Sequence, residues 1–415
     1  MSVNPVLGAS IGAPRKDPLE IARHLSSNFR QTAHDRDKVG GAAKPERDQL
    51  RQSGLLSLII PEAYGGWGAT FPVAFDVVKE IATSDGSLGH IFGYHLLLQL
   101  GVELLGNAEQ AARFYREAAQ RRWFVGNASS ENNSHVRDWK TTASATAGGG
   151  YLLNGVKHFC SGSVDADQLF VFGVIDGDPA LAGAIVTAMI PSDREGVQIN
   201  GDWDAIGMRQ TDSGGVVFRN VEVLSSEVLG QPNAIVDGFF DGSLASLWTP
   251  AVQLMFSFMY LGVAEGALAE AVEYTRTRSR PWSPAGVQRA IEDPYILARY
   301  GEFAVQLQGA NAAAREAANA LQQIWDQGAP VTPRTRGELM VNVSGVKALA
   351  TRAALEITSG IFEVMGARSS YASHGFDRFW RKVRTHTLHD PVSYKIRDVG
   401  DYTLNGVHPT PGFTS

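Results

Sequence analysis

The hydrophobic positions divide this chain into three stretches with different periods. Over residues 17–119, apolar residues recur at helical spacing in PLEIARHLSSNFRQTA and FPVAFDVVKEIATSDG, which the turn-rich PEAYGGWG separates. Over residues 123–230 the pattern changes to short alternating runs such as YLLNGVKHF, QLFVFGVID and GGVVFRNVEVL. Such runs between turn residues predict the strands of a β-sandwich or barrel. Long helical patterns return over residues 235–401, with lengths typical of a helix bundle.

The three stretches predict three packed domains in an α+β fold. A chain of 415 residues exceeds what one small core supports. We expect an N-terminal α-helical domain over residues 1–120, a middle β domain over 121–234 and a C-terminal helical bundle with an extended tail over 235–415. The tail, NGVHPTPGFTS, is rich in Pro and Gly and has no period.

One stretch, GSLASLWTPAVQLMFSFMYLGVA over residues 242–264, carries no charge and is long enough to span a bilayer. Pro250 and Gln253 interrupt it, and it leads directly into the amphipathic EGALAEAVEYTRTR. These features favour a buried bundle helix, with membrane contact as the alternative.

Composition excludes several classes of function. Hydrophobic and charged contents of 44% and 19% are typical of a folded globular protein. A net charge of -6 without any basic stripe argues against a nucleic-acid partner. Cys160 is the single cysteine, so no intramolecular disulfide can form, and a reducing, cytoplasmic setting is expected. Its setting favours a small buried hydrophobe over a nucleophile. The first residues lack the apolar core of a signal peptide, so we expect none.

Two nearby segments carry the strongest chemical signal. VGNASSENNSH, from Val125, is a small, polar loop after an apolar run, and YLLNGVKHFCSG, from Tyr151, predicts two strands joined by an Asn-Gly turn, with Ser161 at the strand end. This density of Ser, Asn and backbone N–H groups suits a flat, polar heteroaromatic ring. His386 and His389 form an H-x-x-H pair, but with no third ligand nearby we expect no metal.

Four motifs, in this order, resemble those of the acyl-CoA dehydrogenase superfamily: IIPEAYGGWGAT, SSENNSH, YLLNGVKHFCSG and GMRQTDSGGVVFRNVEVLSSEVLG. The resemblance extends over about residues 17–405. It implies an N-terminal helical domain, a central β domain that faces a flavin, and a C-terminal four-helix bundle through which members form homotetramers.

The chain departs from the dehydrogenases at two positions. Acyl-CoA oxidation needs a carboxylate base, because the α-proton is only weakly acidic. The family places a Glu in a Tyr-Glu-Gly segment after the last long helix, where this chain has RTHTLHDPVSYKIRDVG and His389. The Glu-Pro of the family's flavin loop is replaced by Glu131, Asn132 and Asn133. Both changes argue against a dehydrogenase.

Longer runs resemble the two-component flavin monooxygenases within this superfamily: GSLGHIFGYH, GNASSENNSHVRDWK, DWDAIGMRQTDSG, TRSRPW and GFDRFWRKVRTHTLHDPVSYKI. The resemblance implies FMN, supplied as FMNH2 by a separate NAD(P)H-dependent flavin reductase, and O2 as co-substrate. A C4a-(hydro)peroxyflavin then oxidises the sulfur of dibenzothiophene-like aromatics to the sulfoxide and the sulfone. Consistently, no G-x-G-x-x-G nicotinamide motif stands at a strand–helix turn. The alternatives are another substrate, such as indole or another organosulfur compound, and an acyl-CoA dehydrogenase or a catalytically silent flavin binder.

The same resemblance assigns the site residues. His389, Ser161 and His90 are the catalytic candidates, since a hydroxyl and two imidazoles can hold or give protons at the reacting edge of the flavin. Arg280 and Arg368 suit the phosphate. The expected FMN contacts are Tyr94, Asn127, Ala128, Ser129, Ser130, Glu131, Asn132, Lys157, His158, Phe159, Cys160, Ser161, Arg280, Ala367, Arg368 and His389.

Phe159 and Trp203 are expected to form a flat aromatic wall around flavin or substrate. For each of these residues a structural role is the alternative: a packed aromatic ring, a hydrogen-bonded histidine, a strand-end serine or a solvated arginine. The polar loop over residues 130–139 is expected to close as a lid when flavin binds.

Overall fold

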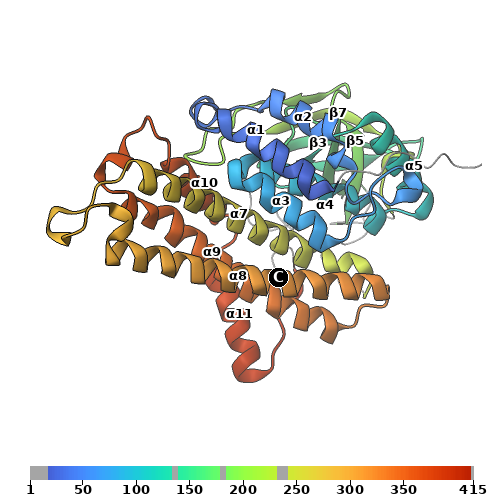
Figure 1. Cartoon of the computed structure of the whole chain (residues 1–415). Helices are drawn as coiled ribbons and strands as arrows, with labels where there is room; N and C mark the ends of the chain where they lie inside the picture. The colour runs from blue at the N-terminus through green and yellow to red at the C-terminus, as the bar shows by residue number, and fades with distance from the viewer. Residues whose placement is uncertain (1–16, 133–138, 178–183, 231–241, 413–415) are drawn as a thin grey trace, which may run out of the picture.

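The fold is taken from a computed structural model, which describes residues 17–132, 139–177, 184–230 and 242–412 (Figure 1). Most of the expected lid, residues 133–138, lies outside the described residues. Helices and strands follow in the predicted order, helical, then β, then helical, and the α+β prediction is confirmed.

The N-terminal part is helical, and polar N-caps start several of its helices. Asp17 accepts a hydrogen bond from the backbone N–H of Leu19 ahead of the first helix, and Asn107 with Gln110 forms a capping box ahead of the fifth. The helices are α1 (Pro18–Val39), α2 (Lys44–Ser53), α3 (Phe71–Ser84), α4 (Gly86–Leu105) and α5 (Ala108–Arg121), with 3-10 turns η1 (Leu55–Ser57) and η2 (Glu62–Tyr64).

The middle part is one seven-stranded mixed sheet in the order β1-β4-β2-β3-β7-β6, with β5 paired to the other edge of β4. Strands β1 and β2 both run parallel to β4 but along different halves of it, so the sheet curls. The strands are β1 (Val125–Ala128), β2 (Thr142–Ala145), β3 (Tyr151–Lys157), β4 (Gln168–Asp176), β5 (Ile185–Pro191), β6 (Val197–Ile199) and β7 (Val216–Val223).

The predicted Asn-Gly turn is wrong. Strand β3 runs through Asn154 and Gly155, and a bulge shifts its pairing with β7 at this point. Asn154 accepts a hydrogen bond from the backbone N–H of Asn220 on β7, at 2.8 Å. Gly155 has φ +151, and a Cβ there would lie 2.5 Å from the Thr141 Cα. The glycine therefore serves close strand packing at a bulge.

The strand also ends earlier than predicted. β3 stops at Lys157, so Phe159, Cys160 and Ser161 lie in a loop and not on a strand. The break has a conformational cause, because Phe159 has φ +56, in the left-handed region that bulky residues avoid. The turn directs Ser161 back toward α4.

The C-terminal part is built on three long helices that pack against one another, α7 (Trp248–Thr277), α8 (Pro294–Gln327) and α9 (Pro333–Met365). Helix α10 (Asp377–His386) packs on α7 and α9, and α11 (Val392–Asn405) extends from α9 away from the sheet (Figure 1). Short turns connect these elements: η5 (Ser225–Glu227), η6 (Leu244–Leu247), η7 (Ser283–Ala285), η8 (Ala290–Glu292) and η9 (Ala367–Ser370).

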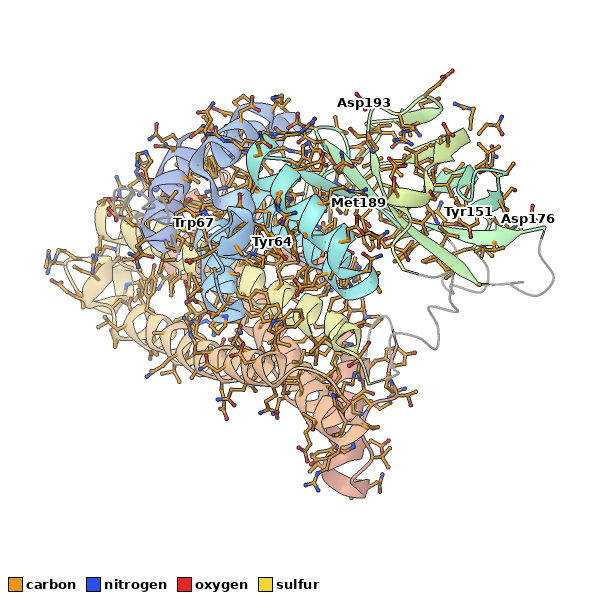
Figure 2. All side chains as sticks on the ribbon, turned by 90° about the vertical axis from the view of Figure 1, so that its right-hand side faces the viewer. Tyr64, Trp67, Tyr151, Asp176, Met189 and Asp193 are labelled. Carbon is orange, nitrogen blue, oxygen red and sulfur yellow. The ribbon has the colours of Figure 1, made fainter. Side chains whose placement is uncertain are left out.

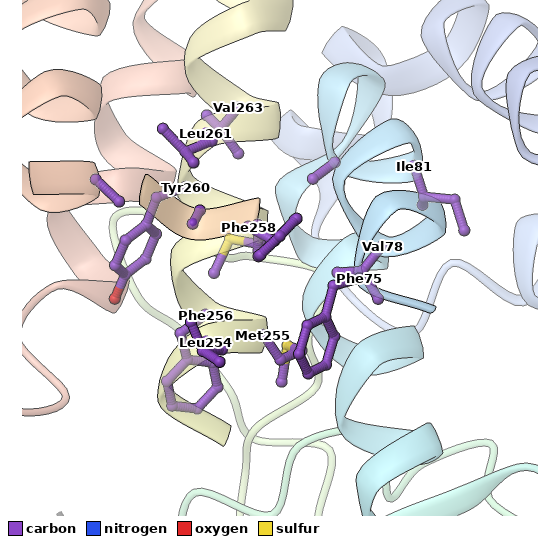
Figure 3. Close-up of a cluster of buried hydrophobic side chains, with 14 of the residues drawn as sticks. Phe75, Val78, Ile81, Leu254, Met255, Phe256, Phe258, Tyr260, Leu261 and Val263 are labelled. Carbon is purple, nitrogen blue, oxygen red and sulfur yellow. The ribbon is translucent and has the colours of Figure 1, made fainter. Parts of the chain in front are cut away.

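Helix α7 joins the N-terminal helices to the bundle. Phe75 and Val78 of α3 pack against Met255 and Phe258 of α7, while Tyr260 points to the opposite side of α7 (Figure 3). Among the residues that the structure describes, two helices, α4 and the η6–α7 segment, are long and apolar enough to cross a bilayer by composition. Their apolar windows are 78% and 89% buried inside the protein, as expected for core helices.

Candidate active site

A continuous chain of buried hydrogen bonds joins elements of the N-terminal, middle and C-terminal parts. His90 of α4 lies 3.2 Å through Nε2 from the Ser161 Oγ, and 3.1 Å through Nδ1 from Nε2 of His386, at the end of α10. The Tyr260 hydroxyl of α7 lies 2.8 Å from Nδ1 of His386. All four residues are buried. Both nitrogens of His386 are therefore engaged by Tyr260 and His90, which argues for a hydrogen-bonding role over metal ligation.

The chain continues on the other side of Ser161. Its Oγ lies 2.8 Å from the Ser213 Oγ, Ser213 donates to the Thr211 Oγ1 at 2.7 Å, and Thr211 donates to the Met208 carbonyl at 2.9 Å. The indole N–H of Trp203 donates to the same carbonyl at 2.8 Å. The chain therefore extends from the bundle into the β domain, with Ser161 at its centre.

Burial keeps both imidazoles neutral. Desolvation, with smaller contributions from His389 and Lys347, lowers the pKa of His90 to about 3, and desolvation also holds the pKa of His386 well below its ordinary value. Each ring therefore carries one N–H and one lone pair near neutral pH.

A buried carboxylate anchors the helix that carries His90. Asp85 caps the N-terminus of α4 by accepting from the Ser87 N–H at 3.0 Å, and it pairs with Arg36 of α1 and Lys382 of α10. Burial favours the neutral acid, but these two cations outweigh it and hold the pKa of Asp85 well below its usual range. One carboxylate thus fixes α4 and α10, the helices that carry His90 and His386.

The loop that carries Ser161 is held by backbone pairing. The Asn127 N–H donates to the Ser161 carbonyl at 2.9 Å, and the Gly162 N–H donates to the Thr211 carbonyl at 2.9 Å. Three non-glycine residues with positive φ, Phe159, Met208 and Asp212, lie in the two segments that meet here. Such conformations cost about 1–3 kcal/mol each and concentrate at functional sites.

His389 stands at the edge of the cluster. Its ring stacks on that of His386 with centroids 5.8 Å apart, its side chain is 50% exposed, and its Nδ1 lies 3.1 Å from Asp390. Lys347 lies 3.7 Å from the same carboxylate. Burial opposes ionisation of Asp390, yet Lys347 and the His389 hydrogen bond lower its pKa. Because Asp390 binds Nδ1, a ligand would be met by Nε2 of His389.

Two of the predicted cofactor contacts, Lys157 and Glu131, form an ion pair with each other. The Lys157 Nζ lies 2.8 Å from Glu131, and both side chains are nearly inaccessible. Glu131 also accepts from the backbone N–H groups of Lys140 and Thr141. This pair closes the ends of the polar loop onto β3, so its visible role is to shape the loop.

The remaining residues of the polar loop lie beside Ser161. Asn127 donates to the Phe159 carbonyl at 3.2 Å and accepts from the Ser129 hydroxyl at 2.6 Å. The His158 N–H donates to the Ser130 carbonyl. Cys160 and Ala128 are buried in the core of the β domain, and Asn132 is exposed. Burial raises the pKa of the Cys160 thiol to about 12, which fits a packed, unreactive group.

Aromatic rings surround the cluster. Phe159 is 53% exposed and meets Trp203 edge to face at 6.2 Å, so Phe159 is not a core residue. On the other side, Tyr94 stacks on His90 at 5.5 Å, and Phe256 contacts His386 at 4.5 Å. Burial raises the pKa of Tyr94 to about 12. The polar chain therefore runs between apolar walls.

Three predicted FMN contacts lie elsewhere in the chain. Arg368 donates to the Arg278 carbonyl at 2.8 Å, which places Ala367 and Arg368 next to the segment of Arg280. This end of the bundle, after α7 and α9, lies on the side opposite the sheet in Figure 1. A single copy of the protein brings His90, Ser161 and His389 together. Arg280, Ala367 and Arg368 of the same copy lie away from that cluster.

A cavity of about 730 Å³ lies between α5 and the sheet, at a distance from this cluster in the fold. Its lining includes Arg113, Trp123, Met189 and Asp193, and Figure 2 shows the last two on the sheet side. No member of the hydrogen-bond chain lines it. Because none of the linked hydroxyl and imidazole groups reaches this cavity, we place the candidate site at Ser161.

Several residues of the chain escaped the sequence patterns. Tyr260 stands in no quoted motif, Thr211 and Ser213 lie in GMRQTDSGG but were given no role, and His386 was considered only as a metal ligand. Lys347, buried with its pKa lowered to about 8 chiefly by desolvation, is likewise missing from the sequence prediction. The one available signal was polar residues inside otherwise apolar helices, such as Lys347 within GELMVNVSGVKALATRAA.

The donor set around Ser161 fits a flavin ring. Ser161, 9% exposed and backed by two neutral imidazoles, can serve the nitrogen edge of the ring through its hydroxyl, and Phe159 with Trp203 offers flat apolar contact. The polar loop at Asn127 and Ser129 adds further donors and acceptors beside it.

The chain belongs to the acyl-CoA dehydrogenase family. Models of the family's N-terminal, middle and C-terminal domains match residues 20–122, 127–221 and 254–394. The family defines a flavin-binding fold in which the middle sheet lies between two helical parts, as observed here.

Individual relatives are more informative about the branch. A dibenzothiophene monooxygenase of Rhodococcus qingshengii is 60% identical over 403 residues, 97% of each chain. A Pseudomonas putida protein named "Probable FMNH2-dependent monooxygenase SfnC" is 40% identical and covers 99% of this chain and 100% of the relative. FMN-bound TdsC from Paenibacillus sp. A11-2 matches with TM-score 0.94 and 54% identity, over 96% of this chain and 100% of TdsC. TdsC has also been solved with FMN and indole together, and that structure matches at 53% identity and TM-score 0.93, with the same shares of the two chains covered.

Proposed function

We propose that this chain is the oxygenase of a two-component flavin monooxygenase, which takes FMNH2 from a separate NAD(P)H-dependent reductase. With O2 it oxidises the sulfur of dibenzothiophene-like aromatics to the sulfoxide and then the sulfone. The observation that carries the proposal is the neutral, buried hydrogen-bond chain centred on Ser161 beside the polar loop. The relatives that bind FMN and carry monooxygenase names support it.

The residues of the chain provide three services to this reaction. Bound FMNH2 supplies the electrons that activate O2. Ser161 and the backing His90 would hold the nitrogen edge of the ring in one orientation, and the His389 imidazole would hold or move a proton there through Nε2. Phe256 and Tyr94, packed on the imidazoles, exclude water from the reacting edge.

The structure argues against the dehydrogenase alternative. The carboxylate closest to the expected base position, Asp390, is 5% exposed and is engaged by His389, Lys347 and Lys395. It therefore lacks the access that a base needs to abstract a substrate proton. His389 instead presents an imidazole at this position.

The substrate assignment follows the relatives, since dibenzothiophene monooxygenases are 60% identical and one matched structure holds indole. We expect the purified chain, supplied with FMN, NADH and an unrelated flavin reductase, to convert dibenzothiophene to its sulfoxide and sulfone, as resolved by chromatography. Indole serves as the competing substrate. Product from indole alone would move the assignment to an indole oxygenase, and no product from either would overturn the proposal.

We also propose that the chain works as a homotetramer in the reducing cytoplasm. Arg280, Ala367 and Arg368 lie at the end of the bundle away from Ser161, so as flavin contacts they serve the site of a neighbouring copy. Exposed apolar side chains along α8, namely Tyr295, Leu297 and Val305, give the bundle a surface for such contacts. Light scattering of the purified 44.7 kDa chain tests this, with four chains per particle as the expected result.

A further inference from the structure

The hydrogen-bond chain through Ser161 ends on a group that has no proton. Going from α7 to the β domain, the contacts are Tyr260 to His386, His386 to His90, His90 to Ser161, Ser161 to Ser213, Ser213 to Thr211, and Thr211 to the carbonyl of Met208. A carbonyl oxygen accepts hydrogen bonds and cannot donate them. Protons must therefore be supplied from the six side chains alone.

Counting these protons fixes their direction. Three hydroxyls, one phenol and two neutral imidazoles carry one exchangeable proton each, and there is one contact for each proton. Every contact is satisfied only if each group donates toward Met208. Tyr260 then donates to Nδ1 of His386, Nε2–H of His90 donates to Ser161, and the Ser161 hydroxyl donates to Ser213.

A reversed chain is less satisfied. Tyr260 could turn its proton to the His386 carbonyl, 3.3 Å away, which would let Ser161 donate to His90. One of the short hydroxyl contacts at Ser213 would then face lone pair to lone pair, which costs about 1–3 kcal/mol for a buried polar group. If the contact without a proton is the one between Ser213 and Thr211, Ser161 donates to His90 and accepts from Ser213. Its proton and one lone pair are then still in use.

The consequence concerns what Ser161 can offer to a third partner. With its proton held by Ser213 and one lone pair held by His90, the Ser161 Oγ keeps a single free lone pair. Reduced flavin carries a hydrogen on N5, whereas N5 of oxidised flavin is a bare acceptor. A lone pair therefore accepts from the reduced form and repels the oxidised one.

Resting on the proposed function, we propose that Ser213, by capturing the hydroxyl proton of Ser161, makes the site selective for reduced over oxidised FMN. Ser213 is a positioning residue, because it acts on the flavin through Ser161. This device lets the protein accept FMNH2 from a reductase and release FMN after turnover.

The test is the ratio of the dissociation constants of oxidised and dithionite-reduced FMN, measured anaerobically by equilibrium dialysis. We expect the unaltered protein to bind reduced FMN about tenfold or more tightly than oxidised FMN. This is the size expected when reduced N5 gains a hydrogen bond to Ser161 and oxidised N5 finds no donor there. Ser213→Ala should bring the ratio close to one, because the released Ser161 hydroxyl can donate to oxidised N5. In Ser213→Ala the midpoint potential of bound FMN should therefore fall, by about 30 mV for each tenfold loss of the preference for reduced FMN.

Two variants separate the outcomes. Ser213→Thr keeps a hydroxyl and should retain the original ratio, and Tyr260→Phe, at the far end of the same chain, leaves both neighbours of Ser161 in place and should retain it too. Equal binding of the two flavin forms by the unaltered protein, or an unchanged ratio in folded Ser213→Ala, would overturn the inference. Failure to bind reduced FMN at all would instead overturn the proposed function.

Discussion

Replacing Ser161 with alanine is expected to lower the rate of sulfur oxygenation by about 10²-fold or more, the scale of a positioned proton-transfer or hydrogen-bonding group in a dry site. Ser161 is the junction of the buried chain, so its loss separates His90 from Ser213 and removes the hydroxyl at the proposed flavin edge. The measurement is kcat for sulfoxide formation at saturating FMNH2.

A matched control lies two residues away. Ser163 is also fully buried, but its hydroxyl has no hydrogen-bond partner among the residues that the structure describes. Ser163→Ala should therefore keep nearly full activity. Comparable losses in both variants would show that the loop is merely sensitive to substitution, and full activity in Ser161→Ala would remove Ser161 from the site.

Replacing Arg47 with methionine is expected to destabilise the protein by about 3–5 kcal/mol, the cost of removing one partner of a buried ion pair. Arg47 of α2 is fully buried and lies 2.7 Å from Asp212, which is 2% exposed. It also donates to the Gly162 carbonyl at 2.8 Å and stacks over the Phe124 ring at 4.2 Å. It thus fastens the N-terminal helices to the two segments that flank Ser161.

The double variant Arg47→Met/Asp212→Asn provides the control. Removing the Asp212 carboxylate as well should recover a large part of the lost free energy of unfolding. Chemical denaturation of the unaltered protein, the two single variants and the double variant measures this recovery as a double-mutant cycle. A loss below about 1 kcal/mol in Arg47→Met would show that the pair is weakly coupled, as exposed pairs are.

The sequence predicted the layout of the fold well because each part has its own period. The apolar repeat in FPVAFDVVKEIATSDG becomes α3, and the alternating QLFVFGVID becomes β4. The prediction of a turn at Asn154 and Gly155 was wrong. A turn and a β-bulge need the same conformational freedom of glycine, and only the pairing with the partner strand distinguishes them.

The candidate site was predicted in part for a similar reason. His90 and Ser161 stand in distinctive local runs, so each was found alone. The hydrogen-bond chain that runs through them also needs Tyr260 from α7, His386 from α10 and Ser213 from the loop before β7. These residues are far apart in sequence, and no local pattern marks their encounter. The pairing of Glu131 with Lys157 was hidden in the same way.

The most direct measurement is an anaerobic mixture of the purified chain, chemically reduced FMN and dibenzothiophene, exposed to ¹⁸O2 in the absence of any reductase. If the chain is the oxygenase, mass spectrometry will find one ¹⁸O atom in the sulfoxide, in an amount limited by the FMNH2 supplied, and the Ser161→Ala variant will form much less of this product. Unlabelled sulfoxide, or label that forms equally without the protein, would contradict a monooxygenase site at Ser161.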